Sequence, residues 1–275
     1  MRLATIRTAD GTRAVRIEDD WAVETVHSDL VELLTLPAWR ELAASAAGRR
    51  HQVDGVSYAP LVARPEKIIC VGLNYRAHLL EMGRELPEHP TLFAKYSRSL
   101  IGANDDIVVP TVSDALDWEA ELGVVIGLPV RHATEEQAAA AIAGFTVVND
   151  VTGRDYQYRT LQWLQGKTFE SSTPVGPWLV TADPDIVGSS HRLTCEVDGE
   201  LMQEADTGDL VFPPVALVRY ISSILTLMPG DLIATGTPGG VGHARKPPRY
   251  LRSGSEVITR IEGIGECRNI CADEK

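Results

Sequence analysis

The stretch "LDWEAELGVVIG", residues 116–127, carries two glutamates into a pattern that otherwise predicts a buried strand. Glu119 and Glu121 are two residues apart, and the side chains of a strand alternate between faces, so both carboxylates point the same way. Two like charges about 4 Å apart repel by about 4 kcal/mol at an effective dielectric constant near 20. These glutamates have two explanations: an exposed strand face, or a cation that meets both carboxylates. The apolar run that follows is typical of a central, buried strand, where unpaired carboxylates would be costly.

A third carboxylate ends another apolar strand, in "IAGFTVVND" (142–150). Asp150 alone would be explained by a helix cap or an Asx-turn. Together with Glu119 and Glu121 it forms an all-oxygen ligand set, which suits Mg²⁺, Mn²⁺ or Ca²⁺ better than zinc. The three acids therefore favour a divalent metal site with positions left open for water or substrate.

Basic and amide side chains follow these acids along the chain. Arg154 and Gln157 come four and seven residues after Asp150, so a helical turn would place all three on one face. Lys167 lies between a predicted helix and a Pro/Gly turn. Each residue alone could be a surface charge, but the grouping suits an oxo-acid ligand that bridges a metal and basic groups.

Two further segments carry candidate functional residues. His78 and Glu81 lie at positions i and i+3 of a predicted short helix, where they form either a solvated pair or a general base oriented by a carboxylate. The loop that follows this helix could move as a lid. The glycine-rich turn "ATGTPGGVGHARKPP" (234–248) lacks the phosphate-loop and dinucleotide signatures, but its N–H groups and the Thr237 hydroxyl could meet an anion.

Composition limits the class of protein. The chain has 275 residues, 44% of them hydrophobic and 23% charged, which is typical of one large or two smaller globular domains. The net charge of −12 argues against nucleic acid or an anionic membrane as the main partner, but it permits anionic substrates. The four cysteines form no CxxC pair, and no apolar run is long enough for a membrane span or a secretory leader. A cytoplasmic protein is expected.

The pattern of elements predicts an α+β, mainly β fold, with a small N-terminal α+β domain over residues 1–63 and a second domain over 64–275. In the first domain a helix is expected within residues 28–50, with Ser28 or Asp29 as its N-cap. The segment "KIICVGL" (67–73) predicts a buried strand. Further strands are expected at 107–109, 118–126, 144–149, 176–181, 193–198, 231–235 and 256–262, and further helices at 75–84, 134–143 and 213–227.

Five segments in order resemble the fumarylacetoacetate hydrolase superfamily: "VGLNYRAH" (71–78), "DWEAELGVVIG" (117–127), "VVNDVTGRDYQ" (147–157), "GKTFESSTPVGPW" (166–178) and "LIATGTPGGVG" (232–242). The resemblance runs from about residue 66 to 270, and residues 1–63 resemble the small N-terminal domain of bacterial members more loosely. It implies a mixed β-roll core, a homodimer, and a divalent metal held by Glu119, Glu121 and Asp150.

The resemblance also implies roles for the other residues. Arg154, Gln157, Lys167 and the turn at Gly236 and Thr237 would contact the substrate, and His78 with Glu81 would activate water. The metal and Lys167 would stabilise the charge of a pyruvate-type enolate as a bond to C3 breaks. This predicts a hydrolase that cleaves a C–C bond in an acylpyruvate or related 2,4-diketo acid. The alternatives are a decarboxylase or isomerase of oxo-acids and, from another class, a non-catalytic oxo-acid-binding protein.

Overall fold

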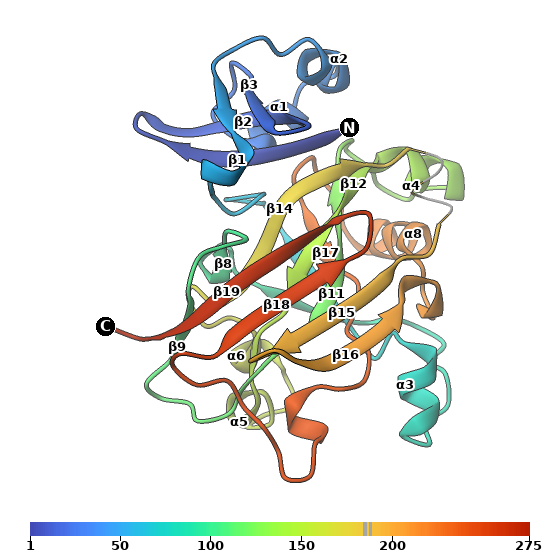
Figure 1. Cartoon of the computed structure of the whole chain (residues 1–275). Helices are drawn as coiled ribbons and strands as arrows, with labels where there is room; N and C mark the ends of the chain where they lie inside the picture. Colours follow the sequence, from blue (N-terminus) through green and yellow to red (C-terminus); the bar gives the residue numbers. More distant parts are fainter. Residues whose placement is uncertain (184–185, 187–188) are drawn as a thin grey trace.

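The computed structural model describes residues 1–183, 186 and 189–275. Strands dominate over helices, and two mixed sheets form most of the molecule, as Figure 1 shows. The prediction of an α+β, mainly β fold with a mixed β-roll core is confirmed.

The larger sheet supplies the strands in which, or at whose ends, the three predicted metal ligands Glu119, Glu121 and Asp150 lie. Its strand order is β4 (Arg50–Gln52), β3 (Trp21–Glu24), β2 (Gly11–Glu18), β1 (Arg2–Thr8), β14 (Thr173–Thr181), β12 (Ile142–Asn149), β11 (Ala120–Ile126), β17 (Leu232–Ala234), β6 (Ile68–Gly72) and β7 (Thr91–Lys95). Every residue of β11 and β12 is buried, which explains their near-continuous apolar sequences. The two strands run antiparallel with Ala120 opposite Asn149, so the start of β11 meets the end of β12.

A second sheet covers one face of β11 and β12. Its order is β16 (Glu200–Asp206), β15 (Arg192–Val197), β18 (Glu256–Ile261), β19 (Gly265–Asp273) and β9 (Ile107–Val109), and Figure 1 shows these strands in front of the larger sheet. Inward side chains of the two sheets share one apolar core, which includes Val124, Val147 and Val257. A buried hydrogen bond of 2.9 Å, from Asn149 Nδ2 to Thr259 Oγ1, ties the end of β12 to the second sheet.

The N-terminal segment continues the larger sheet, because β1 pairs with β14 in antiparallel register. The single helix expected within residues 28–50 is wrong: α1 (Leu30–Leu34) and α2 (Trp39–Ala44) are separate, and β4 begins at Arg50. Pro37 lies between the two helices, where it has no N–H to continue the first. Asp29 is the N-cap of α1 and accepts a hydrogen bond from Glu32 N. The domain boundary at residue 63 stays a prediction.

The three other predicted helices are present but shorter: α3 (Arg76–Glu81), α4 (Glu135–Ala141) and α8 (Pro214–Ile224). Two single-turn helices, α5 (Arg154–Gln157) and α6 (Leu164–Lys167), lie near the start of β11 together with the paired short strands β10 (Leu116–Asp117) and β13 (Thr152–Gly153). Two short strands branch from the larger sheet: β5 (Ser57–Tyr58) pairs with β1, and β8 (Leu100–Ile101) pairs with β14. Among the described helices, none has the length and apolarity needed to cross a membrane.

The close approach of β12 and β14 depends on a glycine. A Cβ added at Gly144 would overlap the backbone carbonyl oxygen of Val180 and lie 2.9 Å from Leu179 Cδ1. We predict that Gly144→Ala lowers the free energy of unfolding by about 1–3 kcal/mol, because a rigid backbone atom must move. Urea denaturation followed by circular dichroism measures this change. Gly55→Ala is the control, since no atom lies within 4 Å of the added Cβ, and equal stability of the two variants would contradict the prediction.

Candidate active site and metal centre

Three carboxylates meet where β11 begins and β12 ends. Ligand oxygens of Glu119, Glu121 and Asp150 lie within 4.8 Å of one another, and all three residues are buried. The strand pairing causes this, because Asp150 N donates to Glu119 O at 2.8 Å and Glu119 N donates to Asn149 Oδ1 at 2.9 Å. The backbone thus places side chains 29 or more positions apart in sequence at one point.

Two buried lysines form ion pairs with Glu119 and Asp150. Lys167, the last residue of α6, donates from Nζ to Glu119 Oε2 at 2.6 Å and to Asp150 Oδ2 at 2.9 Å. Lys95, the last residue of β7, donates from Nζ to Asp150 Oδ1 at 2.6 Å and to Val151 O at 3.1 Å. Both ammonium groups are almost fully buried, so Asp150 carries one lysine on each oxygen.

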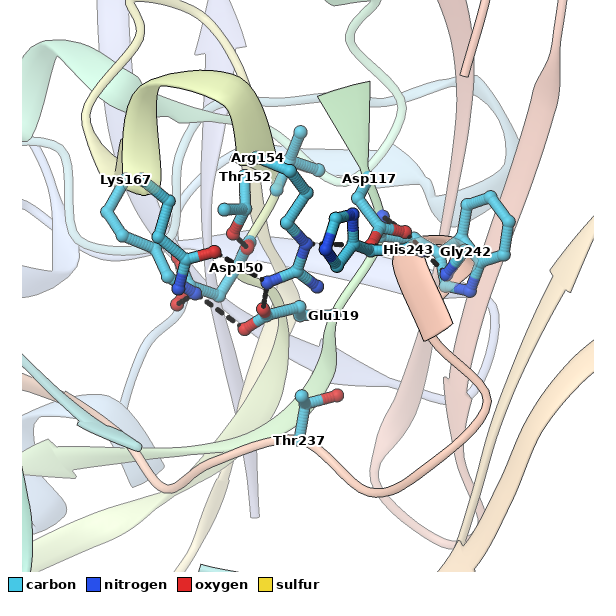
Figure 2. A network of polar contacts seen from close by, with 12 residues as sticks. Asp117, Glu119, Asp150, Thr152, Arg154, Lys167, Thr237, Gly242 and His243 are labelled. Carbon is cyan, nitrogen blue, oxygen red and sulfur yellow. Dashed lines mark hydrogen bonds and ion pairs between the residues drawn. The ribbon is translucent and has the colours of Figure 1, made fainter. Parts of the chain in front are cut away.

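Arg154 connects this cluster to a fourth buried acid, Asp117. Its Nε donates to Asp117 Oδ2 at 2.8 Å, and its Nη1 lies 2.7 Å from Glu119 Oε1 and 2.9 Å from Gln157 Oε1. Figure 2 shows Arg154 between Asp117 and Glu119, with Lys167 on the far side of Glu119. The helix begins only at Arg154, so the expected single helical face with Asp150 is wrong; Asp150 lies on the chain after β12.

Sequence reasoning missed Asp117 and Lys95. Asp117 stands two residues before Glu119 and continues the same i, i+2 series, which was the available signal. It is fully buried and also accepts backbone hydrogen bonds from Gly242 and His243, at 2.7 and 2.9 Å. Lys95 is the last residue of a strand, and Asp150 directly follows one, but the two are 55 residues apart, and the sequence gives no sign of their contact.

Charge and burial lower the pKa of one acid and raise that of another. Burial disfavours the charged form of Asp150, but Lys167 and Lys95 outweigh it and lower its pKa. Burial would likewise lower the pKa of Lys167, yet Asp150 and Glu119 outweigh it, so its pKa is raised and the amine stays protonated. Burial, with the charges of Asp150 and Glu119, raises the pKa of Glu121 well above its usual value.

The cluster fits a hard divalent cation. Glu121 is 1% exposed, and its one hydrogen bond within the described structure comes from Gly236 N to Oε2 at 2.8 Å. Within the described residues it has no basic partner, unlike Glu119 and Asp150. A divalent ion on the three carboxylates would supply the missing positive charge, and an all-oxygen donor set suits Mg²⁺, Mn²⁺ or Ca²⁺.

The glycine-rich turn closes the site from β17. Gly236 has a φ of 104°, and an added Cβ would lie 2.9 Å from both Asn74 Cβ and Val71 O, so a side chain is excluded here. The Thr237 hydroxyl donates to Ala120 O at 3.0 Å and accepts from Gln203 Nε2 at 2.9 Å. The turn therefore holds Glu121 through the Gly236 N–H. Contact of Gly236 or Thr237 with the substrate stays a prediction.

Helix α3 carries His78 and Glu81 beside this turn. His78 is half-buried and Glu81 is exposed; both are described, and no hydrogen bond joins their side chains. A Cβ added at Gly239 would lie 3.0 Å from His78 Nδ1 and 3.5 Å from Glu81 Oε2, so both groups border the turn. Burial lowers the pKa of His78 and outweighs the charges of Glu81 and Glu119, which favour the imidazolium form.

The base of α3 is fixed from a distant segment. Tyr75, the N-cap residue, makes no side-chain cap, and Asp209 Oδ2 instead accepts a hydrogen bond from Ala77 N at 2.9 Å. Asn74 adds bonds from its Nδ2 to Phe212 O at 3.0 Å and to Thr235 O at 2.8 Å. These contacts position His78 relative to the turn at 236–240.

One cavity of about 270 Å³ brings most of the predicted residues together. Its lining includes His78, Glu119, Arg154, Gln157, Lys167 and Thr237. The aromatic rings of Phe93 and Trp163 also line the cavity, with their centroids 5.4 Å apart. Lys167 Nζ lies 4.9 Å from the centre of the Phe93 ring. Four predicted site residues are not among these lining residues: Glu81, Glu121, Asp150 and Gly236. The catalytic, binding and metal roles of all these residues stay predictions.

Comparisons with known proteins agree in family and in fold. The model of the fumarylacetoacetate (FAA) hydrolase C-terminal family matches residues 67–271. A mitochondrial oxaloacetate tautomerase of Rattus norvegicus is 44% identical over 211 residues, which cover 76% of this chain and 67% of the relative. The fumarylacetoacetate hydrolase of Exiguobacterium antarcticum is 31% identical with a TM-score of 0.88, and the match covers all of both chains. A 2-hydroxyhepta-2,4-diene-1,7-dioate isomerase from Mycobacterium marinum is 32% identical with a TM-score of 0.81, covering 100% of this chain and 99% of that one.

We predict that Glu121→Gln removes divalent-metal binding while the protein stays folded, because an amide lacks the charge that the cation needs. In the unchanged protein, Mg²⁺ or Mn²⁺ at about 100 times its Kd should stabilise the fold by about 2.7 kcal/mol. Thermal unfolding with and without metal, and calorimetric titration with Mn²⁺, measure both effects. Glu170→Gln, at an exposed acid paired with Arg98, is the matched control. An unaltered metal response in Glu121→Gln would rule out this assignment.

Proposed function

The chain belongs to the fumarylacetoacetate hydrolase family, and we propose that it is a divalent-metal-dependent enzyme that interconverts the keto and enol forms of a 2-oxo acid of the oxaloacetate type. One observation carries the proposal: a neutral base and a fixed positive charge line the same cavity. The pKa of His78 is lowered by burial, whereas Asp150 and Glu119 raise that of Lys167 against the effect of its burial. His78 can therefore accept a proton near pH 7, and Lys167 can only stabilise negative charge.

The buried end of the cavity offers donors for a carboxylate. Arg154 uses Nε and Nη1 on Asp117, Glu119 and Gln157, and its Nη2 has no partner among the described residues. Gln157 accepts a hydrogen bond from Arg154 through Oε1, and its Nε2 group has no acceptor among the described residues. Both side chains are about 95% buried and line the cavity. We assign these two donors to the C1 carboxylate of the substrate.

The reaction then needs one proton acceptor and a group that stabilises the negative charge on the C2 oxygen. His78 takes a proton from C3, the C–H electron pair becomes the C2–C3 double bond, and the oxygen on C2 takes up negative charge near the Lys167 ammonium. Return of the proton from His78 to that oxygen, directly or through solvent, gives the enol and restores the neutral base, and the reverse steps give the keto form. A divalent ion (Mg²⁺, Mn²⁺ or Ca²⁺) held by Glu119, Glu121 and Asp150 would supply Lewis-acid stabilisation of the substrate's oxygens.

Cleavage of an acylpyruvate is the second candidate. It is favoured by the position of Glu81 beside His78 around Gly239, because a carboxylate next to an imidazole can orient it toward water. Decarboxylation of oxaloacetate would use the same charge stabilisation without attacking water. The homodimer that the family resemblance implies remains a prediction.

Proton NMR on two substrates with Mg²⁺ separates these reactions. For oxaloacetate we expect accelerated decay of the enol form without matching release of pyruvate, compared with metal alone. Pyruvate in excess of the metal-only rate would identify a decarboxylase, and pyruvate plus acetate from acetylpyruvate would identify a hydrolase. If none of these rates exceeds the metal-only control, the proposed function is wrong.

We predict that His78→Gln lowers kcat about 10²- to 10⁴-fold, as expected for loss of a general base. In the unchanged enzyme, kcat/KM should fall as the pH drops through a pKa below 6.5, because protonated His78 cannot accept a proton. This acid limb should vanish in the variant. The measurement is a pH profile with saturating metal, and His89→Gln, at an exposed histidine that stacks on Tyr220, is the control. An acid limb that persists in His78→Gln would assign the base elsewhere.

A further inference from the structure

The two ends of the active-site cavity differ in burial and in charge pairing. At one end lie Glu119, Arg154 and Lys167, which are at most 5% exposed and joined by ion pairs. At the other end lie Met82 and Arg84, which are both exposed and line the same cavity. The cavity therefore has a buried polar end and an open mouth, whose exposed lining includes Met82 and Arg84 at the C-terminal end of α3 and Tyr158 and His243 from other segments.

Arg84 has a defined position at this mouth. Gly83 has a φ of 67°, its N–H donates to Leu80 O at 2.9 Å, and Arg84 N donates to Leu79 O at 3.0 Å. This pair of hydrogen bonds is the Schellman arrangement, in which a left-handed glycine ends the helix and returns the chain toward its last turn. The backbone of Arg84 is thus tied to the same short helix that carries His78.

Arg84 also differs from the other strong cations of the cavity in its pairing. Arg154 and Lys167 each contact two carboxylates, as described above. The guanidinium of Arg84 has no hydrogen-bond or ion-pair partner within the described part of the chain. In a protein with 38 acidic and 26 basic residues, this cation at a cavity mouth is available to an anion from solution.

We propose that Arg84 binds the second carboxylate of the substrate, so that the enzyme selects acyclic 2-oxo dicarboxylic acids over 2-oxo acids with a neutral far end. A planar guanidinium matches a carboxylate through two parallel hydrogen bonds. Val71, Phe93 and Trp163 also line the cavity, and their apolar surface suits the carbon chain of such a substrate. The inference rests on the proposed function, because the buried end must hold the 2-oxo acid group.

The test compares two substrates that differ only at the far carboxylate: oxaloacetate and its 4-methyl ester, each with Mg²⁺. We expect Arg84→Gln to lower kcat/KM for oxaloacetate about 10- to 100-fold, mainly through KM, as for loss of a charged hydrogen-bonded pair. Turnover of the ester should not change, and Arg84→Lys should restore part of the loss. Arg76→Gln, at an exposed arginine of α3 that does not line the cavity, is the matched control and should leave both substrates unaffected.

Binding of oxalate, which has only the buried-end groups, separates this inference from the proposed function. Arg84→Gln should bind oxalate as the unchanged protein does, by calorimetry with Mg²⁺. If Arg84→Gln lowers kcat/KM equally for oxaloacetate and its ester, or for neither, the role of Arg84 is overturned while the proposed function stands. If the unchanged protein binds no oxalate and converts neither substrate, the proposed function fails and this inference fails with it.

Discussion

The burial of four carboxylates at one place is the constraint on which the rest of the site depends. An ionised carboxylate without a partner in a protein interior is so costly that it must be paired, bound to a metal or protonated. Here Asp117, Glu119 and Asp150 form ion pairs with three buried cations, Lys95, Arg154 and Lys167, whereas Glu121 has no basic partner among the described residues. Removing one partner of such a pair costs about 3–5 kcal/mol, because the other charge stays buried. The strands and single-turn helices that supply these groups are therefore fixed relative to one another.

The sequence predicts the centre of this network better than its periphery. Glu119, Glu121 and Asp150 stand out because charged residues interrupt or end apolar strands, and a period of two places the glutamates on one face. Asp117 follows the same period but lies in the separate short strand β10, before the apolar run begins. Lys95 is recognisable only through its contact with Asp150, since a lysine at the end of a strand is ordinary at a surface. Contacts between distant segments depend on tertiary packing, which local pattern does not encode.

The same limit explains where the fold departs from expectation. Strands β11, β12 and β17 follow from their apolar runs, whereas the helix expected within residues 28–50 divides around Pro37. The two short helices α1 and α2 still bury their apolar faces, for example through Leu33 and Trp39. The hydrophobic pattern therefore predicts which residues are buried, but not whether they belong to one continuous helix. The pairing of β1 with β14, which extends the larger sheet into the N-terminal segment, has no local sequence signal.

The network also separates fixed charge from mobile protons. Lys95 and Lys167 lower the pKa of Asp150 and hold it ionised, and Asp150 and Glu119 in turn raise the pKa of Lys167, so Lys167 does not readily lose its proton near pH 7. His78 lies outside these ion pairs on α3, where burial favours its neutral form. Isomerisation, decarboxylation and hydrolysis of an oxo acid all need the fixed charges, and they differ in what happens farther along the substrate. Because α3 carries His78 and ends in the turn to Arg84, the proposed base and the proposed contact at the cavity mouth are held by one short helix. Under the proposed function, the choice among reactions and substrates therefore depends on this helix more than on the buried carboxylates.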